Sequence, residues 1–138
     1  MNPNETRVAL NTGLAILGLV GLRLVAAAFT PITFDEAYYW MWSKHLAGGY
    51  YDHPPMVSWL IWLGTTVFGH NEFGVRIGSL LCGFIAIGYL YAFASNLYNK
   101  STAMLSVLLM VVLPVGFVSG LLMMPDASLV AAWMATLY

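Results

Sequence analysis

TFDEAYYWMWSKHLAGGYYDHPPM, residues 33–56, is the stretch around which this chain is organised. It holds three of the six acidic residues and two of the three histidines of the protein, together with many aromatic residues. Long apolar segments that carry few charges flank it on both sides. Polar side chains placed at the edge of membrane-grade segments are costly, so they commonly mark a functional site. We therefore expect any chemistry to lie in this block.

The composition excludes a soluble globular domain. Of the 138 residues, 60% are hydrophobic and only 8% are charged, whereas a soluble domain carries about 25% charged residues. The lipid bilayer is therefore an expected partner. The net charge is −1 and no basic patch is present, so nucleic acid is not an expected partner. The single cysteine, Cys82, has no second cysteine with which to form an internal disulfide.

The first apolar segment, residues 8–29, is long enough for a helix to cross a bilayer. A cleaved signal peptide is the alternative, but the apolar run is too long for one and Arg23 interrupts it. Arg23 has two readings. Its side chain reaches the membrane surface, or it faces a polar cavity and contacts an anion, which would make it a substrate-binding residue.

The central block predicts two short helices that lie at the membrane surface. Thr33 and Glu36 form the Thr-x-x-Glu pattern of a capping box, which predicts a helix that runs to about Leu46. Its aromatic residues recur at helical spacing, which is typical of an interfacial helix. Pro54-Pro55 predicts the start of a second helix over residues 56–68, capped by Asp52 or His53. Both helices are too short to span a membrane.

Further spans are expected at about 74–97 and 102–123, with Pro114 kinking or interrupting the latter, and an incomplete span at 127–138. Asn71 is the expected cap of the first, and Ser101 or Thr102 of the second. The predicted fold is all-α and multi-pass, with residues 1–138 forming the N-terminal part of one transmembrane domain of a longer protein. Counting crossings places the loop at 31–73 and the Pro125-Asp126 turn on the same side of the membrane.

Four carboxylates are therefore expected on one side: Asp35, Glu36, Asp52 and Asp126. Each also has a purely structural explanation. Glu36 completes the capping box, Asp35 suits a first helical turn, and Asp126 follows a helix-starting proline. Carboxylates that converge on one membrane face can nevertheless act as a base or hold a divalent cation.

The strings FDEAYYW and GYYDHPP, with MPDA at residues 124–127, carry a family resemblance. They resemble the first extracytoplasmic loop and second acidic turn of membrane glycosyltransferases of fold type C. More narrowly, they resemble the dolichyl-phosphate-mannose–protein mannosyltransferases and their bacterial relatives, which include the lipid A aminoarabinose transferases.

The resemblance implies an inverting transfer of a sugar from a polyprenyl phosphate to a protein, lipid A or glycan acceptor. It implies an enzyme of the bacterial inner membrane with the 31–73 loop facing the periplasm, and in some relatives a divalent metal. Asp35 would be the general base, and His53 stands where the aminoarabinose transferases carry a lysine. The implied catalytic residues are Asp35, Glu36 and Asp126, the implied substrate-binding residues are Tyr51, Asp52 and His53, and Asp35 and Asp126 are the candidate metal ligands.

Two other functional classes remain open at this stage. A transporter or channel subunit would need acids or broken helices near the middle of the membrane. The predicted spans contain no carboxylate, and only Pro114 breaks one of them, which disfavours this class. An assembly subunit without catalytic activity is the other alternative, and the unfinished last segment disfavours it.

Overall fold

The structure is a computed structural model that describes residues 3–138, with side chains described from residue 6 onward. The described residues form seven α-helices and no strand, which confirms the all-α prediction. The helices are α1 Pro3–Phe29, α2 Phe34–Ser43, α3 Met56–Phe68, α4 Glu72–Leu97, α5 Lys100–Val112, α6 Pro114–Ser119 and α7 Pro125–Leu137.

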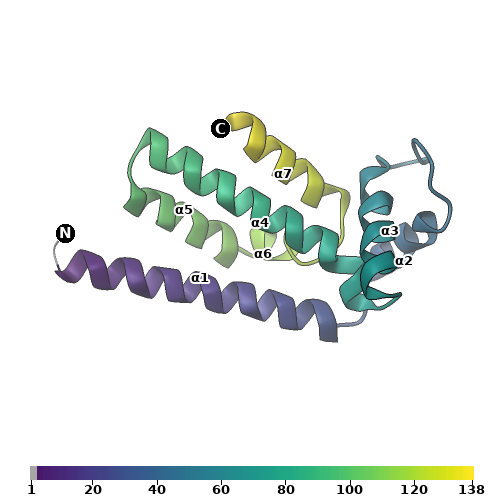
Figure 1. The fold of residues 1–138 in the computed structure, drawn as a ribbon, viewed down its shortest axis with the longest axis horizontal. Coiled ribbons are helices and arrows are strands. Elements are labelled where there is room, and N and C mark those ends of the chain that lie inside the picture. The colour runs from purple at the N-terminus through teal and green to yellow at the C-terminus, as the bar shows by residue number, and fades with distance from the viewer. Residues whose placement is uncertain (1–2) are drawn as a thin grey trace.

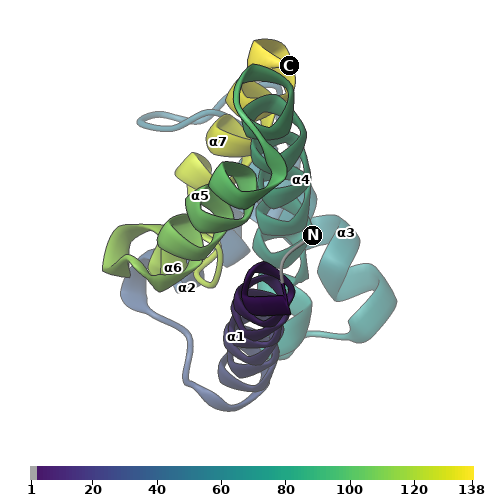
Figure 2. The same ribbon diagram turned by 90° about the vertical axis from the view of Figure 1, so that its left-hand side faces the viewer.

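The long helices lie side by side, and the two short loop helices cover one end of them (Figure 1). Two helices are long and apolar enough to cross a membrane, at Thr6–Phe29 and Glu72–Leu97. They run in opposite directions with α2 and α3 between them, and α5 and α6 then return the chain, so α2, α3 and the start of α7 gather at one end of the molecule. Viewed along the bundle in Figure 2, α1 packs beside α4 and α5.

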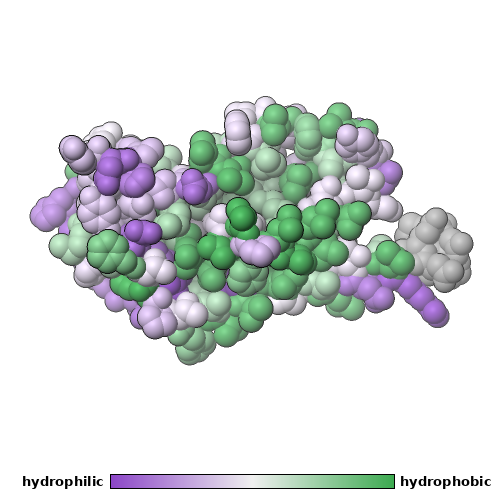
Figure 3. Space-filling model, turned by 180° about the vertical axis from the view of Figure 1, so that it is seen from behind, coloured by the Kyte–Doolittle hydropathy of each residue, from purple (hydrophilic) through white to green (hydrophobic). Residues whose placement is uncertain are grey.

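The surface of the long helices differs in polarity from that of the end that carries α2 and α3. In Figure 3, hydrophobic residues cover the middle of the molecule, and hydrophilic residues gather at the end that carries α2 and α3. Leu14, Leu17 and Val25 on α1 are all more than half exposed. An apolar helix face of this kind is suited to lipid.

The third predicted span is interrupted, as the position of Pro114 indicates. Helix α5 ends at Val112, Leu113 adopts an extended backbone, and Pro114 begins the short helix α6. Proline has no N–H to donate and its ring clashes with the preceding turn, which explains the break. The chain from 102 to 123 therefore does not form one continuous helix.

The local capping predictions are partly correct. The capping box of Thr33 and Glu36 is present, and Asn71 caps α4 by accepting from the Gly74 N–H. Asn99, and not Ser101 or Thr102, caps α5. Asp52 and His53 do not cap α3, since its N-cap is Pro55 and no side chain bonds there. Helix α2 also ends earlier than predicted, at Ser43.

Helices α3 and α4 approach closely enough that only glycine fits at their contact. A Cβ added to Gly64 on α3 would collide with the carbonyl oxygen of Gly74 and the side chain of Ile77 on α4. Backbone atoms cannot move aside as a flexible side chain can, so the two helices would have to separate.

We expect Gly64→Ala to lower the free energy of unfolding by about 1–3 kcal/mol, because overpacking of this size costs that much. Gly88→Ala is the matched control, since a Cβ at Gly88 on α4 meets no atom within 4 Å. The Gly88 variant should be as stable as the parent protein or slightly more so. Thermal unfolding in detergent measures both, and equal melting temperatures for the two variants would contradict the packing argument.

Candidate functional site

A buried ion pair lies beneath the loop end of the molecule. Glu36 on α2 and Arg76 on α4 are both fully buried, with 0% of each side chain exposed. Arg76 Nε donates to Glu36 Oε1 and Arg76 Nη2 donates to Glu36 Oε2, each over 2.7 Å. This bidentate geometry is the strongest form of an arginine–carboxylate contact.

The remaining hydrogen bonds of the pair join several segments. Arg76 Nη1 donates to the Thr30 carbonyl over 2.7 Å, and Nη2 donates to the Pro31 carbonyl over 2.9 Å. On the other side, the Met123 N–H donates to Glu36 Oε1 over 3.1 Å. The pair thus connects the end of α1, the start of α2, the body of α4 and the turn before α7.

Glu36 remains ionised in this environment. Burial alone would raise its pKa, but hydrogen bonds from Arg76, Thr33 and Met123, with the positive charge of Arg76, outweigh burial and lower the pKa. A carboxylate held in this way is not free to take a proton from a substrate. Its evident effect is to fix neighbouring segments, and a direct role in catalysis stays a prediction.

Three exposed carboxylates lie around one buried tyrosine. Asp35 and Asp126 are solvent-accessible in the first turns of α2 and α7, and Asp52 lies in the loop between α2 and α3. Burial first, and then the negative charges of Asp35, Asp52 and Asp126, raise the pKa of the Tyr39 phenol. All three carboxylates are therefore close enough to act on Tyr39, which is only 4% exposed.

The buried ion pair explains how residues far apart in sequence meet here. Asp35 directly precedes Glu36, and Asp126 follows Met123 by one short turn. Because Glu36 bonds both Arg76 and the Met123 N–H, it sets the position of α2 relative to the start of α7. The buried contacts of Glu36 thus fix the two segments that carry Asp35 and Asp126.

The aromatic side chains of α2 shape the loop that carries Asp52 and His53. Tyr50 stacks on Trp42 with ring centroids 4.4 Å apart and an interplanar angle of 3°. The Tyr50 hydroxyl lies within hydrogen-bond distance of the carbonyl oxygens of Trp42 and His45, at 3.1 and 3.0 Å. The half-buried His53 lies edge-on to Tyr39, with ring centroids 5.5 Å apart.

The other predicted substrate contacts of this loop differ in their surroundings. The Tyr38 hydroxyl donates to Asp52 Oδ1 over 3.4 Å, a long hydrogen bond that leaves the carboxylate exposed. Tyr51 is fully exposed to solvent. Asp52 is thus one of the three carboxylates that act on Tyr39, and His53 contacts the Tyr39 ring. Tyr51 points away from any packed surface.

Arg23 lies apart from this site, inside the bundle. It is only 4% exposed, so its side chain does not reach the membrane surface, and that reading was wrong. Its Nη2 donates to the Gly116 carbonyl over 2.6 Å, and its guanidinium lies 5.0 Å from the Phe117 ring centroid. Arg23 thus satisfies a carbonyl of the short helix α6, next to the break at Pro114.

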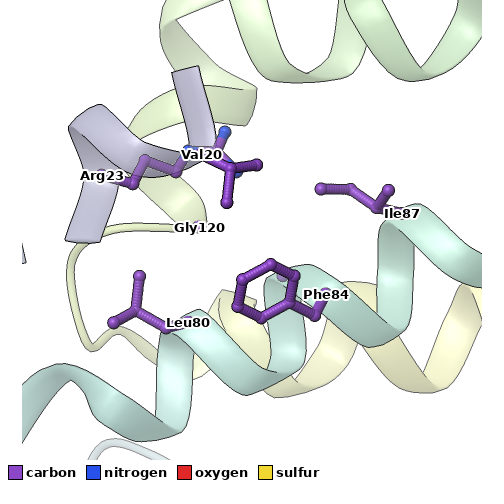
Figure 4. A pocket seen from close by; sticks show the side chains of 7 residues that line it. Val20, Arg23, Leu80, Phe84, Ile87 and Gly120 are labelled. Atoms are coloured by element: carbon purple, nitrogen blue, oxygen red, sulfur yellow. The ribbon is translucent and has the colours of Figure 1, made fainter. Parts of the chain in front are cut away.

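A small cavity adjoins Arg23, with a volume of about 10 Å³. Apolar side chains of α1 and α4 line most of it, as Figure 4 shows for Val20, Leu80, Phe84 and Ile87. The Arg23 Nε finds no hydrogen-bond partner among the described residues. A space of this size has room for about one water molecule. Contact between Arg23 and an anion of the substrate stays a prediction.

The candidate metal ligands do not form a complete set within the part of the chain that the structure describes. No three His, Cys, Asp or Glu side chains lie close enough together there to hold a metal ion. Asp35 and Asp126 would need a further ligand to bind a divalent cation in the usual manner. The metal site therefore stays a prediction.

A comparison with sequence families decides the relationship of the chain. The profile described as dolichyl-phosphate-mannose-protein mannosyltransferase matches residues 52–138, which is more than half of the chain. The chain belongs to this mannosyltransferase family. Asp35 and Glu36 precede the matched segment, so the argument for them rests on the geometry above and on the resemblance of the loop.

Parts of the chain are similar to known proteins. A lipid A galacturonosyltransferase of Rhizobium johnstonii is 43% identical over 60 residues, which cover 42% of this chain and 13% of that protein. An undecaprenyl phosphate-alpha-4-amino-4-deoxy-L-arabinose arabinosyl transferase of Pseudomonas savastanoi is 32% identical over 81 residues, covering 59% of this chain and 15% of the relative.

A second transferase of the same description, from Pseudomonas fluorescens, is 33% identical over 61 residues, covering 44% of this chain. The match spans 11% of that protein. The chain therefore covers less than a fifth of the length of each of these three relatives. No solved structure matches the chain.

Two residues that the structure brings into the site, Arg76 and Tyr39, were not predicted from the sequence. Arg76 was not among the predicted site residues, although an arginine in the first turn of a predicted span favours a carboxylate partner. Tyr39 counted only as one of many aromatics on an interfacial helix. Its burial depends on a core cluster that other segments supply, with Val57, Ile61, Val75 and Met123, and local sequence contains no signal for that.

Proposed function

We propose that the protein is an inverting glycosyltransferase that uses a sugar carried on a polyprenyl phosphate. Membership of the mannosyltransferase family supports sugar transfer in general. The observation that carries the proposal is that three exposed carboxylates act on Tyr39, and that the buried Glu36–Arg76 pair positions the segments of two of them, Asp35 and Asp126. The segments that carry these carboxylates lie at the end of the bundle where α1 ends and α4 begins.

Asp35 is the residue proposed to act as general base. Its carboxylate is exposed and makes no hydrogen bond within the described chain that would occupy it. A base near the acceptor hydroxyl removes its proton as the oxygen attacks the anomeric carbon. The bond from that carbon to the phosphate oxygen breaks, and the phosphate leaves as an anion that needs no acid catalyst. The proposal assigns no step to a metal ion.

Asp126 is proposed to contact the acceptor together with Asp35, since the charges of both carboxylates act on Tyr39. His53 and Asp52 are proposed to border the donor. A protonated His53 would place positive charge near the leaving phosphate, and its edge-on contact with Tyr39 holds the ring in place. Tyr51, which is fully exposed, and Arg23, which lies inside the bundle, are proposed to contact other parts of the substrates.

The names of the relatives suggest the substrates. Two of them use an undecaprenyl phosphate-linked aminoarabinose, and one is a lipid A galacturonosyltransferase. We therefore propose an undecaprenyl-phosphate sugar as donor and lipid A as acceptor, with transfer at the outer face of the inner membrane. A polyprenyl phosphate presents its sugar at headgroup depth, which is the depth expected for α2 and α3.

The test uses membranes that contain the full-length natural gene product. They are incubated with lipid A and undecaprenyl phosphates that carry radiolabelled aminoarabinose, galacturonic acid or mannose. We expect label to appear in lipid A from one of these donors, and not in membranes from cells with an empty vector. A parallel incubation with a chelator tests the metal prediction. Absence of transfer from every donor to lipid A would contradict the proposed substrates.

A further inference from the structure

A second cavity opens beside α2, distinct from the carboxylate group. It has a volume of about 220 Å³. Its lining comes from the α1–α2 connection, α2 and the start of α4, and consists of Ile32, Trp40, His70, Asn71, Glu72 and Val75. None of Asp35, Asp52 and Asp126 lines it. The volume is below the range of about 300–1,000 Å³ that holds drug-sized ligands, so it suits a small group.

The cavity lies at the end of the molecule where α1 ends and α4 begins, which is the level expected for the membrane surface. Ile32 follows the end of α1, and Glu72 is the first residue of α4. A tryptophan at this level is typical of the interface between lipid tails and headgroups. The polar side chains of the cavity are therefore at the depth of phospholipid headgroups.

A lysine is held at the edge of this cavity. Lys44 Nζ lies 3.2 Å from both ring nitrogens of His70 and 4.3 Å from the Trp40 ring centroid. Trp40 Nε1 donates to His70 Nδ1 over 3.3 Å, which orients the imidazole. Two side chains that line the cavity thus position the ammonium group without neutralising it.

The charges at this cavity lack partners of opposite sign. The Glu36–Arg76 contact is the ion pair found within the described residues, so no carboxylate pairs with Lys44 there. Glu72 also lines the cavity, and its carboxylate has no hydrogen bond or ion pair in the described part of the chain. A lysine held against two lining residues and a lining carboxylate thus belong to the surroundings of one cavity, and neither has an ion-pair partner in the described chain.

We propose that this cavity binds the headgroup of a zwitterionic phospholipid, which carries a phosphate and a primary ammonium. Lys44, oriented by His70 and Trp40, bonds the phosphate, and Glu72 bonds the ammonium. A lipid held at this point would fix the junction of α1, α2 and α4 in the bilayer. The proposal is independent of the glycosyl transfer proposed above.

Two other ligands fit the observations less well. A neutral sugar would stack on the Trp40 ring, but the Lys44 ammonium already lies over that ring, and both charges would stay unpaired. An anionic phospholipid would satisfy Lys44 but would bring negative charge to Glu72. A headgroup with both charges satisfies both residues.

The experiment measures lipid binding directly by native mass spectrometry of the full-length protein purified in detergent. The probes are phosphatidylethanolamine and phosphatidylglycerol with identical acyl chains. The variants are Lys44→Ala and Glu72→Gln. Lys100→Ala is the matched control, since Lys100 is an exposed lysine that begins α5 at the opposite end of α4.

We expect phosphatidylethanolamine to bind the parent protein about tenfold more tightly than phosphatidylglycerol, as a hydrogen bond to a charged group contributes on that order. Lys44→Ala should weaken binding of both lipids. Glu72→Gln should weaken phosphatidylethanolamine alone, and Lys100→Ala should change neither. Equal affinity of the parent protein for the two lipids would overturn the proposal, as would unchanged phosphatidylethanolamine binding by both cavity variants.

Discussion

Asp35→Asn is expected to lower the rate of sugar transfer by about 10²–10⁴-fold, which is the usual contribution of a positioned general base. Asparagine keeps the shape of the side chain but cannot accept the proton of the acceptor hydroxyl at neutral pH. Asp35 is exposed in the first turn of α2, so its loss costs only the interaction with the helix dipole, about 0.3–1 kcal/mol. Folding and membrane insertion should therefore be retained.

The measurement is the transfer assay on membranes that hold equal amounts of each variant. Phe34→Ala is the local control, because Phe34 precedes Asp35 in the same turn and is 88% exposed. This control should keep its transfer rate. If Asp35→Asn transfers sugar as fast as the parent protein, Asp35 only stabilises the start of α2, and the proposed mechanism fails.

Arg76→Met is expected to destabilise the protein by about 3–5 kcal/mol, the cost of removing one partner from a buried ion pair. The variant leaves the Glu36 carboxylate without its main partner at a position that is 0% exposed. It also removes the donors to the Thr30 and Pro31 carbonyls, so the end of α1 loses its connection to α4. Thermal unfolding and monodispersity in detergent would show the loss.

A double variant separates the charge from the packing. Glu36→Leu combined with Arg76→Met leaves no buried charge, so it should be less destabilised than Arg76→Met alone. Arg7→Met is the control, because Arg7 is exposed on α1 and its replacement should change stability little. Wild-type stability of Arg76→Met, or a double variant as unstable as the sum of both single variants, would argue against the ion pair as the anchor of this end.

Local features of the fold are predictable from the sequence because their interactions span only a few residues. The pattern of apolar residues predicts α3 at Met56–Phe68 with its observed bounds, and Pro114 predicts the break between α5 and α6. The capping box at Thr33 and the Asn71 cap follow from side chains that bond N–H groups three residues away. The cap of α5 was predicted wrongly at Ser101 or Thr102, because several polar residues that can cap a helix lie close together there and the helix begins earlier, after Asn99.

The sidedness of the molecule is likewise a property of the sequence. Helix α1 leads to the loop end, α4 runs away from it, and α5 and α6 return the chain to it, so the loop and the start of α7 lie at the same end. This length argument brings Asp35 and Asp126 to one end of the bundle. It says nothing about how far apart they lie.

Only the tertiary structure decides which side chains meet at that end. The capping motif explains Glu36 within four residues of chain, yet its carboxylate also bonds Arg76, 40 residues away, and the Met123 N–H, 87 residues away. Arg23 finds its carbonyl partner at Gly116, 93 residues away, where the sequence left a choice between the membrane surface and an anion. Such contacts depend on how the helices cross and rotate, which follows from the packing of all their side chains together, and no local pattern contains that information.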